Sequence, residues 1–334
     1  MKKLIIPKDY KAKLPLFETE VAIKKIKDFF QISLSEELSL TRVSAPLFVR
    51  PESGLNDDLN GIETAVSFST DYEKEVQIVH SLAKWKRMAL HRYGMKPYSG
   101  LYADMNAIRK CEELSNIHSI YVDQWDWEKI IDKSDRTPEK LEDIVKRIYR
   151  VFTDTDKYIV DLYPSLSTKL PEDITFISSQ ELEDKYPTFT SKEREDAITR
   201  EYGAVFISKI GHTLISGEKH DGRAPDYDDW NLNGDILFWN PVLGKALELS
   251  SMGIRVDEDS LASQLEIAGC TDRKDLPFHK MLLDGTLPYT VGGGIGQSRM
   301  CMFFLEKAHI GEVQSSLWPD EMVKRCEKAG IELL

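Results

Sequence analysis

The chain has 334 residues, 41% of them hydrophobic and 30% charged, which is enough to bury one large core or two closely packed halves. Its net charge of −12 disfavours a nucleic-acid-binding protein, because contact with a phosphate backbone needs concentrated lysine and arginine. The four cysteines are scattered and have no CxxC spacing, which predicts reduced thiols in a cytoplasmic protein. No apolar run approaches the roughly 18 residues of a transmembrane helix. We therefore expect neither a membrane nor a nucleic-acid partner.

The first 50 residues are predicted to form a helix and then a strand. The basic start at Met1 precedes only a short apolar run, which disfavours a secretory signal. Within residues 1–30, an amphipathic helix is predicted by apolar positions at helical spacing: Val21, Ala22, Ile26, Phe29 and Phe30. A β-type stretch over 39–48 follows. Its Pro46 cannot donate to a sheet ladder, so we expect this strand at an edge or an interface.

The next part of the chain is predicted to contain a polar loop over 51–63, a helix over 73–93 and two strands around a polar turn over 100–126. The helix over 73–93 carries three cations, which its periodicity places on a solvated face: Lys84, Lys86 and Arg87.

A second amphipathic helix is predicted over 138–163, within a helical excursion at about 128–200 that supports the sheet. The C-terminal third is expected to begin with a loop rich in Asp and Gly over 216–234. Strands over 235–239 and 245–256 follow, and a helix begins near Gln297. Strands joined by turns and long excursions predict an α+β fold, with an antiparallel sheet flanked by helices. With no repeat or obvious linker, residues 1–334 are expected to form a single domain.

The common nucleotide and hydrolase motifs are absent from the sequence. It contains no GxxxxGK[ST] phosphate loop, no GxGxxG, no HExxH and no GxSxG. If the chain uses ATP, a different architecture must therefore hold the nucleotide.

The most distinctive motif is a glycine-rich run over 290–296 that leads into Arg299 and an apolar stretch. Glycines let a flat group approach the backbone closely, and a helix that begins just afterwards presents free N–H groups. Arg299 adds a planar charge suited to phosphate. The alternative is a glycine-rich turn that precedes an arginine on a solvated helix end.

The two strands predicted between residues 100 and 127 carry polar residues on one face. With a period of two, Gln124 and Asp126 point to one side, whereas the aromatic residues Tyr121, Trp125 and Trp127 point to the other. This pattern suggests a surface that lines a ligand, although an ordinary strand with one wet face has the same pattern.

Two carboxylates lie on neighbouring predicted strands and are candidates for a metal site. Asp235 opens one strand, and Glu248 lies on the next, on the same face as Ser250. Such a pair could bridge Mg²⁺ on nucleotide phosphates. The acidic loop upstream is expected to be mostly solvated, at Asp221, Asp226, Asp228 and Asp229.

Together these segments resemble the class II aminoacyl-tRNA synthetase catalytic fold. In that fold, motif 1 is a helix and a strand with a proline at the dimer interface, and the run to Pro46 resembles it. Motif 2 carries an arginine on the α-phosphate, in the position of Arg109, and motif 3 carries an ATP-contacting arginine, in the position of Arg299.

A closer resemblance is to the ammonia-dependent asparagine synthetases, the aspartate–ammonia ligase family. Four blocks carry it: HSLAKWKR at 80–87, YVDQWDW at 121–127, RAPDYDDW at 223–230 and ELSSMGIR at 248–255. The resemblance spans nearly the whole chain, which leaves no room for an anticodon-binding module. It implies a homodimer that forms through residues 1–50.

In that family, ATP and aspartate form a β-aspartyl-adenylate and pyrophosphate, and ammonia then displaces AMP to give asparagine. The resemblance implies that Arg109 stabilises the α-phosphate, that Arg299 holds the nucleotide, and that Asp235 and Glu248 place Mg²⁺. Further ATP contacts are implied for His80, Ser251 and Gly294. Contacts with aspartate are implied for Ser81, Lys86, Gln124, Asp126, Asp228, Ser250 and Arg255.

The resemblance also places Asp57 near the incoming nitrogen. Ammonium has no lone pair and must lose a proton before it attacks. An ordinary aspartate, with a pKa of about 3.9, binds ammonium well but accepts its proton poorly unless burial raises that pKa. The adjacent Asp58 and the more distant Asp228 are alternative candidates for this role.

Three other functions are less consistent with the residues. Glutamine-dependent asparagine synthesis uses an N-terminal cysteine, whereas position 2 is Lys2, so ammonia is the expected nitrogen source. Charging of tRNA fits the superfamily motifs but not the acidic composition or the missing appended module. A non-catalytic paralogue is disfavoured because the chain keeps Arg109, Arg299, Asp235 and Glu248.

Overall fold

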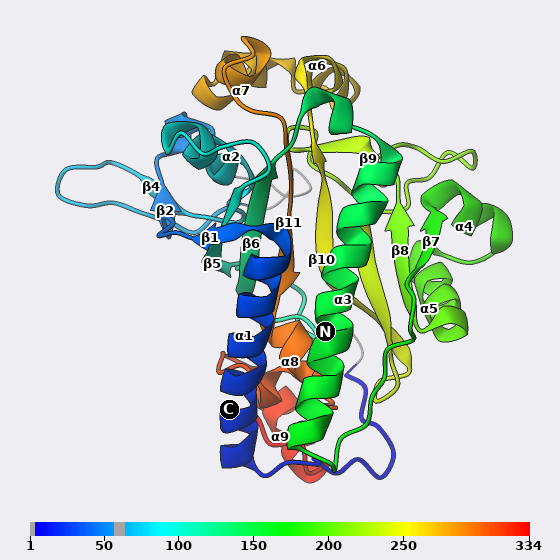
Figure 1. Ribbon diagram of the computed structural model, residues 1–334. Coiled ribbons are helices and arrows are strands. Elements are labelled where there is room, and N and C mark those ends of the chain that lie inside the picture. Colours follow the sequence, from blue (N-terminus) through cyan, green and yellow to red (C-terminus); the bar gives the residue numbers. More distant parts are fainter. Residues whose placement is uncertain (1–3, 57–63) are drawn as a thin grey trace.

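The computed structural model describes residues 4–56 and 64–334. Its centre is an eight-stranded sheet with the strand order β1-β5-β6-β11-β10-β9-β8-β7 (Figure 1). In that order the strands are Leu40–Arg42, Gly100–Ile108, Tyr121–Ile130, Thr290–Gly296, Lys245–Arg255, Asp228–Asn240, Ala204–Ser208 and Thr175–Ser178. A small second sheet has the order β2-β4-β3, with bounds Phe48–Val49, Val76–Ile78 and Ser67–Phe68.

Helices surround the main sheet. From α1 to α9 their bounds are Leu16–Leu38, Ala83–Arg92, Pro138–Leu162, Ser179–Lys185, Ser191–Tyr202, Glu258–Ile267, Pro277–Leu283, Gln297–Phe304 and Asp320–Lys328. In the described residues, short 3-10 helices η1 to η4 span Pro51–Ser53, Lys133–Asp135, Thr271–Asp275 and Ile310–Glu312. No helix in the described part of the chain is both long enough and apolar enough to cross a membrane.

The main sheet is mostly antiparallel, as predicted, but it is mixed. The pairs from β5 through β6, β11, β10 and β9 to β8 are antiparallel, whereas the edge pairs β1/β5 and β7/β8 are parallel. Parallel neighbours need a crossover connection. The small sheet and α2 lie between β1 and β5, and α4 and α5 lie between β7 and β8. The prediction of an antiparallel sheet is therefore wrong at both edges.

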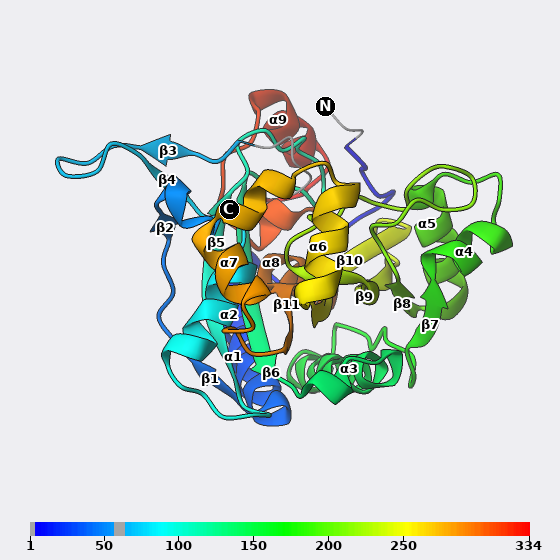
Figure 2. The same ribbon diagram turned by 90° about the horizontal axis from the view of Figure 1, so that it is seen from above.

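The two long helices α1 and α3 cover one face of the sheet, where they lie side by side (Figures 1 and 2). The Phe30 ring on α1 stacks on Trp125 of β6 at a centroid distance of 5.1 Å and lies 4.9 Å from Phe152 of α3. Trp125 and Trp127 are buried in this core. Because strand side chains alternate, Gln124 and Asp126 point to the opposite face, which contains the site described below.

Several predicted boundaries differ from the structure. The first helix runs from Leu16 to Leu38, and Val21 on it is exposed. The stretch 39–48 is not one strand, because Pro46 separates β1 from β2. The predicted helix over 73–93 begins with strand β4, which pairs with β2 and β3, so tertiary pairing overrides the local helical pattern.

The remaining predicted elements agree more closely with the structure. The predicted strand pair over 100–126 corresponds to β5 and β6, the predicted helix over 138–163 is α3, and the helix at Gln297 is α8. The excursion at 128–200 also contains the strand β7, and β9 begins at Asp228, inside the predicted loop.

Candidate active site

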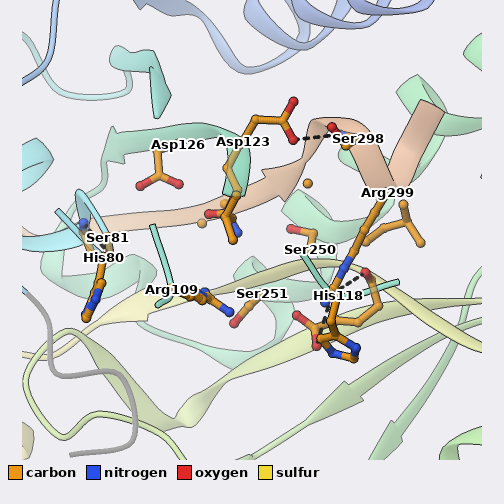
Figure 3. A pocket seen from close by; sticks show the side chains of 18 of the residues that line it. His80, Ser81, Arg109, His118, Asp123, Asp126, Ser250, Ser251, Ser298 and Arg299 are labelled. Atoms are coloured by element: carbon orange, nitrogen blue, oxygen red, sulfur yellow. Dashed lines mark hydrogen bonds and ion pairs between the residues drawn. The ribbon is translucent and has the colours of Figure 1, made fainter. Parts of the chain in front are cut away.

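A cavity of about 470 Å³ opens on the face of the sheet opposite α1 and α3. That volume lies in the usual range for small-molecule sites. Residues from separate segments, among them His80, Arg109, Asp126 and Arg299, gather around it (Figure 3). The cavity has two chemically different ends.

Lys86 of α2 lies at the floor of the cavity and is almost completely buried. Its Nζ donates hydrogen bonds to the main-chain oxygens of Trp127 at 3.0 Å and Gly293 at 3.2 Å, and it lies 3.5 Å from Asp126 Oδ2. Burial lowers the pKa of Lys86, and the carboxylates of Asp126 and Glu128 oppose this shift. Lys86 therefore joins α2 to two strands of the sheet.

The prediction that α2 turns its cations to solvent is wrong. Lys84, Lys86 and Arg87 are 4%, 1% and 2% exposed. Arg87 donates to the main-chain oxygens of Pro288 and Val256, at 2.8 and 2.7 Å. Helical periodicity predicts that a charged face of a helix is exposed. In α2 that face is buried, because its cations bind partners that lie far away in the sequence.

Gln124, Asp126 and Glu128 alternate along one face of β6, as the period of two predicts for the first two. Asp126 Oδ2 accepts a hydrogen bond from the Leu82 main-chain N at 3.1 Å, which attaches the start of α2 to the strand. Glu128 was not singled out, although it is the next position on the same face. The same alternation was the signal that could have identified it.

Arg255 of β10 is held between two buried carboxylates. Its Nε and Nη2 lie 2.8 to 3.1 Å from the Glu128 oxygens, and its Nη1 pairs with Asp228. Thr290 Oγ1 donates to Glu128 Oε1 at 2.7 Å. Burial raises the pKa of Asp228, against the effect of the Arg255 charge. Both predicted residues, Asp228 and Arg255, line the cavity.

The remaining predicted contacts also line the cavity: His80, Ser81, Ser250, Ser251 and Gly294. The main-chain N of His80 donates to Asn56 Oδ1 at 2.9 Å, and Ser81 Oγ accepts from Ala83 N at 3.0 Å. The Ser250 hydroxyl is buried and has no hydrogen-bond partner within the residues that the structure describes. A buried hydroxyl without a protein partner is available to a ligand.

The other end of the cavity is positively charged. Burial opposes ionisation of Glu248, but four cationic side chains outweigh it and lower the pKa of this carboxyl: Arg299, Lys192, Arg223 and Arg109. Arg299 Nη1 donates to the main-chain oxygen of Glu248 at 3.1 Å. Asp123 Oδ1 accepts a hydrogen bond from the Ser298 main-chain N at 3.1 Å, which fixes the helix that carries Arg299 (Figure 3).

Arg223 and Lys192 were given no role by sequence reasoning. Arg223 opens the RAPDYDDW block and pairs with Asp235. Lys192 is one of several charged residues on α5, and nothing in its local sequence marks it. His118 also lines the cavity and was not singled out.

Asp235 and Glu248 fit a magnesium site in part. Burial raises the pKa of Asp235, and the negative charges of Glu248 and Asp221 raise it further. The positive charge of Arg223 opposes this shift. A divalent cation would relieve this repulsion, and Mg²⁺ binds through one or two carboxylates plus phosphates. Asp235 lies inside β9 rather than at its start. Within residues 4–56 and 64–334, no group of three His, Cys, Asp or Glu side chains is arranged to hold a metal.

The prediction that the acidic loop is mostly solvated is wrong. Asp226, Asp228 and Asp229 are 0%, 1% and 5% exposed, because each lies among cationic partners. Of the four, only Asp221 is not buried, and its side chain is 43% exposed. Asp57 and Asp58, the other candidates for handling ammonium, lie outside the described residues.

Comparison with known proteins identifies the family. Residues 17–330 match the family model for aspartate-ammonia ligase. The chain belongs to the aspartate–ammonia ligase family. The aspartate–ammonia ligase of Clostridium tetani is 65% identical over 334 residues, covering 99% of this chain and 98% of the relative. That of Clostridium perfringens strain SM101 is 66% identical over 336 residues and covers both chains fully.

The fold of this ligase-family chain also resembles solved synthetase structures. Asparaginyl-tRNA synthetase from Pyrococcus horikoshii, complexed with asparaginyl-adenylate, matches with a TM-score of 0.64 at 16% identity, over 90% of this chain and 70% of that one. The enzyme from Entamoeba histolytica, also in complex with asparaginyl-adenylate, gives 0.63 at 13% identity, over 90% and 66%. The α+β fold is therefore that of a class II synthetase catalytic domain.

Proposed function

We propose that this chain converts L-aspartate and ammonia to L-asparagine with ATP, through a β-aspartyl-adenylate, and releases AMP and pyrophosphate. Membership of the aspartate–ammonia ligase family supports the overall reaction. One observation supports this mechanism more than any other: the two ends of the cavity differ in charge. The floor contains paired side chains of opposite charge, whereas the other end is cationic. The floor suits an amino acid with charges of both signs, and the cationic end suits a triphosphate.

Aspartate binds at the floor of the cavity. Its α-ammonium group is held by the carboxylate of Asp126, its α-carboxylate is held by Lys86 and Gln124, and Asp228 lies at the same end. Ser81, Ser250 and Arg255 complete this end, with the unpartnered Ser250 hydroxyl available to donate to the substrate. This orientation leaves the β-carboxylate directed to the cationic end.

ATP binds with its phosphates at the cationic end, and His80, Ser251 and Gly294 contact the nucleotide. A β-carboxylate oxygen attacks the α-phosphorus, and pyrophosphate leaves with the electron pair of the broken P–O bond. Arg109 and Arg299 stabilise the negative charge that builds on the phosphates, and removing one such donor typically costs about 10²–10³ in rate. Mg²⁺ on Asp235 and Glu248 would add positive charge beside the departing pyrophosphate.

Ammonia then attacks the carbonyl carbon of the adenylate, and AMP leaves. The nitrogen must lose a proton, so a carboxylate near it is needed to bind ammonium and accept that proton. Asp57 is our first candidate. Asp228 is the second, since burial raises its pKa and makes it a better base. In Asp57→Ala, we expect slower asparagine formation with normal ATP–pyrophosphate exchange, and a normal ammonia step would exclude the role.

We also propose that residues 1–334 form a single catalytic domain that works as a homodimer through residues 1–50. Several side chains in this segment expose apolar surface, among them Leu16, Phe17, Ile32, Leu47 and Phe48. Light scattering of the purified chain tests the dimer, and a monomer at assay concentrations would contradict it.

The reaction is tested by incubating the purified protein with ATP, Mg²⁺, aspartate and ¹⁵N-labelled ammonium. We expect asparagine labelled in its side-chain amide, with AMP and pyrophosphate in equal amounts. Glutamine and tRNA serve as alternative acceptors in parallel reactions. A product that forms only with tRNA would replace this proposal with a charging reaction, and no AMP under any condition would rule out adenylate chemistry.

A further inference from the structure

Lys192 lines the cationic end of the cavity and has no role in the mechanism above. Its Nζ lies 2.9 and 3.1 Å from the two carboxylate oxygens of Glu195 on the same helix, and 3.4 Å from Asp221 Oδ2 on a distant loop. The side chain is 64% exposed, so the ammonium group is accessible to a ligand.

The position of Lys192 is unfavourable for its own helix. It lies in the first turn of α5, where the helix dipole favours anions and opposes cations. The simple structural explanation is a surface ion pair between Lys192 and Glu195, of a kind that contributes little to stability. That ion pair does not explain why Lys192 also contacts Asp221, or why its side chain lines the cavity.

The other three cations around Glu248 have protein contacts of their own. Arg299 donates to two main-chain oxygens, of Glu248 at 3.1 Å and of Ile117 at 3.4 Å. Arg223 is paired with the buried Asp235, and Arg109 lies 3.9 Å from Glu112. Lys192 differs from them because its ammonium is a compact point charge on a flexible stem.

We propose that Lys192 leaves Asp221 when ATP binds and contacts the β- and γ-phosphates, and then the pyrophosphate that they become. This inference rests on the proposed function and adds a residue to it. When the bond between the α-phosphorus and its bridging oxygen breaks, the electron pair goes to pyrophosphate, and Lys192 neutralises part of that charge. Lys192 transfers no proton in this step.

The distribution of charge in the cavity favours phosphates over aspartate as the partner of Lys192. At the floor, the cations Lys86 and Arg255 lie beside carboxylates, so that end already carries charges of both signs for aspartate. Lys192 instead acts on Glu248, the carboxylate around which the three arginines converge. A fourth cation at that end is suited to a ligand with several negative charges.

The experiment compares Lys192→Ala and Lys192→Arg with the wild-type chain, using Lys245→Ala as the matched control. Lys245 also pairs with an aspartate of α5, Asp196 at 2.9 Å, but it does not line the cavity. Binding of pyrophosphate and of AMP is measured separately by calorimetry with Mg²⁺ present. AMP lacks the β- and γ-phosphates, so it reports on the rest of the nucleotide site.

For Lys192→Ala we expect pyrophosphate to bind about 10-fold to 100-fold more weakly, with AMP binding unchanged. Lys192→Arg should recover most of the loss, and Lys245→Ala should behave as wild type. Unchanged pyrophosphate binding in Lys192→Ala, or an equal loss for AMP, would overturn the inference. Neither binding measurement requires turnover, so this result stays separate from the test of asparagine formation.

Discussion

Gly294 lies opposite Asp126 in the pairing of β11 with β6, and its missing side chain leaves room for the polar groups of β6. A Cβ atom on Gly294 would lie 2.4 Å from Gln124 Oε1 and 2.8 Å from Asp126 Oδ1. The glycine at this position therefore shapes the floor of the cavity, because a larger residue would displace both polar side chains.

For Gly294→Ala we expect the KM for aspartate to rise by about tenfold or more, because the new methyl group pushes Gln124 and Asp126 away from the substrate. Steady-state kinetics with ATP saturating measures this effect. Gly296→Ala is the comparison, since its Cβ would lie 3.4 Å from Arg299 Cβ, an ordinary contact, and its effect should be much smaller. Equal effects of the two substitutions would contradict this account of Gly294.

Removing either proposed magnesium ligand should raise the Mg²⁺ concentration needed for half-maximal activity. For Asp235→Asn and Glu248→Gln we expect an increase of about tenfold or more, because one of two carboxylates is lost. The measurement is activity against free Mg²⁺ at constant ATP. Glu218→Gln, at an exposed carboxylate outside the cavity, is the control. A Mg²⁺ dependence that stays the same in both variants would place the metal elsewhere.

Asp226 holds three separate elements together beside the cavity. Its Oδ2 lies 3.3 Å from Lys84 Nζ on α2, 3.0 Å from Arg273 Nη1 on η3 and 3.0 Å from His279 Nε2 on α7. Burial opposes ionisation, yet Lys84, His279 and Arg273 together hold the pKa of Asp226 well below its ordinary value.

For Asp226→Asn we expect the free energy of unfolding to fall by about 3–5 kcal/mol, because Lys84 is left buried without an anion. Urea denaturation measures the loss. Asp259→Asn on α6, at an exposed position, should change stability by less than about 0.5 kcal/mol. Comparable losses in the two variants would show that the buried charges are not the cause.

His309 should make the protein less stable in acid. Burial lowers the pKa of His309 to about 4, from an ordinary value of 6.5. Between these values the unfolded chain binds a proton that the folded chain does not, so stability rises with pH from about 4 to 6.5 and falls on acidification. The full difference corresponds to about 3 kcal/mol.

The free energy of unfolding, measured at several pH values between 4 and 7, tests this prediction. In His309→Gln the dependence on pH should be weaker than in the wild type over that window. His91→Gln, at an exposed position on α2, should leave the dependence unchanged. A wild-type slope in His309→Gln would show that other groups cause the acid sensitivity.

Local patterns predicted the parts of the fold in which neighbouring residues determine structure. The amphipathic pattern of α3 and the alternation on β6 each have a regular period, so both are predictable from the sequence. Strand β4 and the parallel edges of the sheet depend on partners far away in the chain, which no local window contains. For the same reason the local pattern around Asp228, a charged run, predicts a loop, whereas Asp228 begins β9.

The site shows the same division between local and distant information. Gln124 and Asp126 were predictable from alternation, and Arg299 from the glycines before it. Lys86 was assigned to the site by resemblance alone, because its carboxylate partners lie about 40 residues away in the sequence. Lys192 had no local signal, since only the folded chain brings it close to Asp221.

The most direct test of the proposed chemistry uses aspartate labelled with ¹⁸O in its β-carboxylate, with ATP, Mg²⁺ and ammonium. If the β-carboxylate attacks the α-phosphorus, one labelled oxygen is transferred to each AMP, and mass spectrometry of AMP detects it. We predict singly labelled AMP in amounts equal to the asparagine formed. Asparagine formed together with unlabelled AMP, or with ADP and phosphate, would contradict the adenylate mechanism.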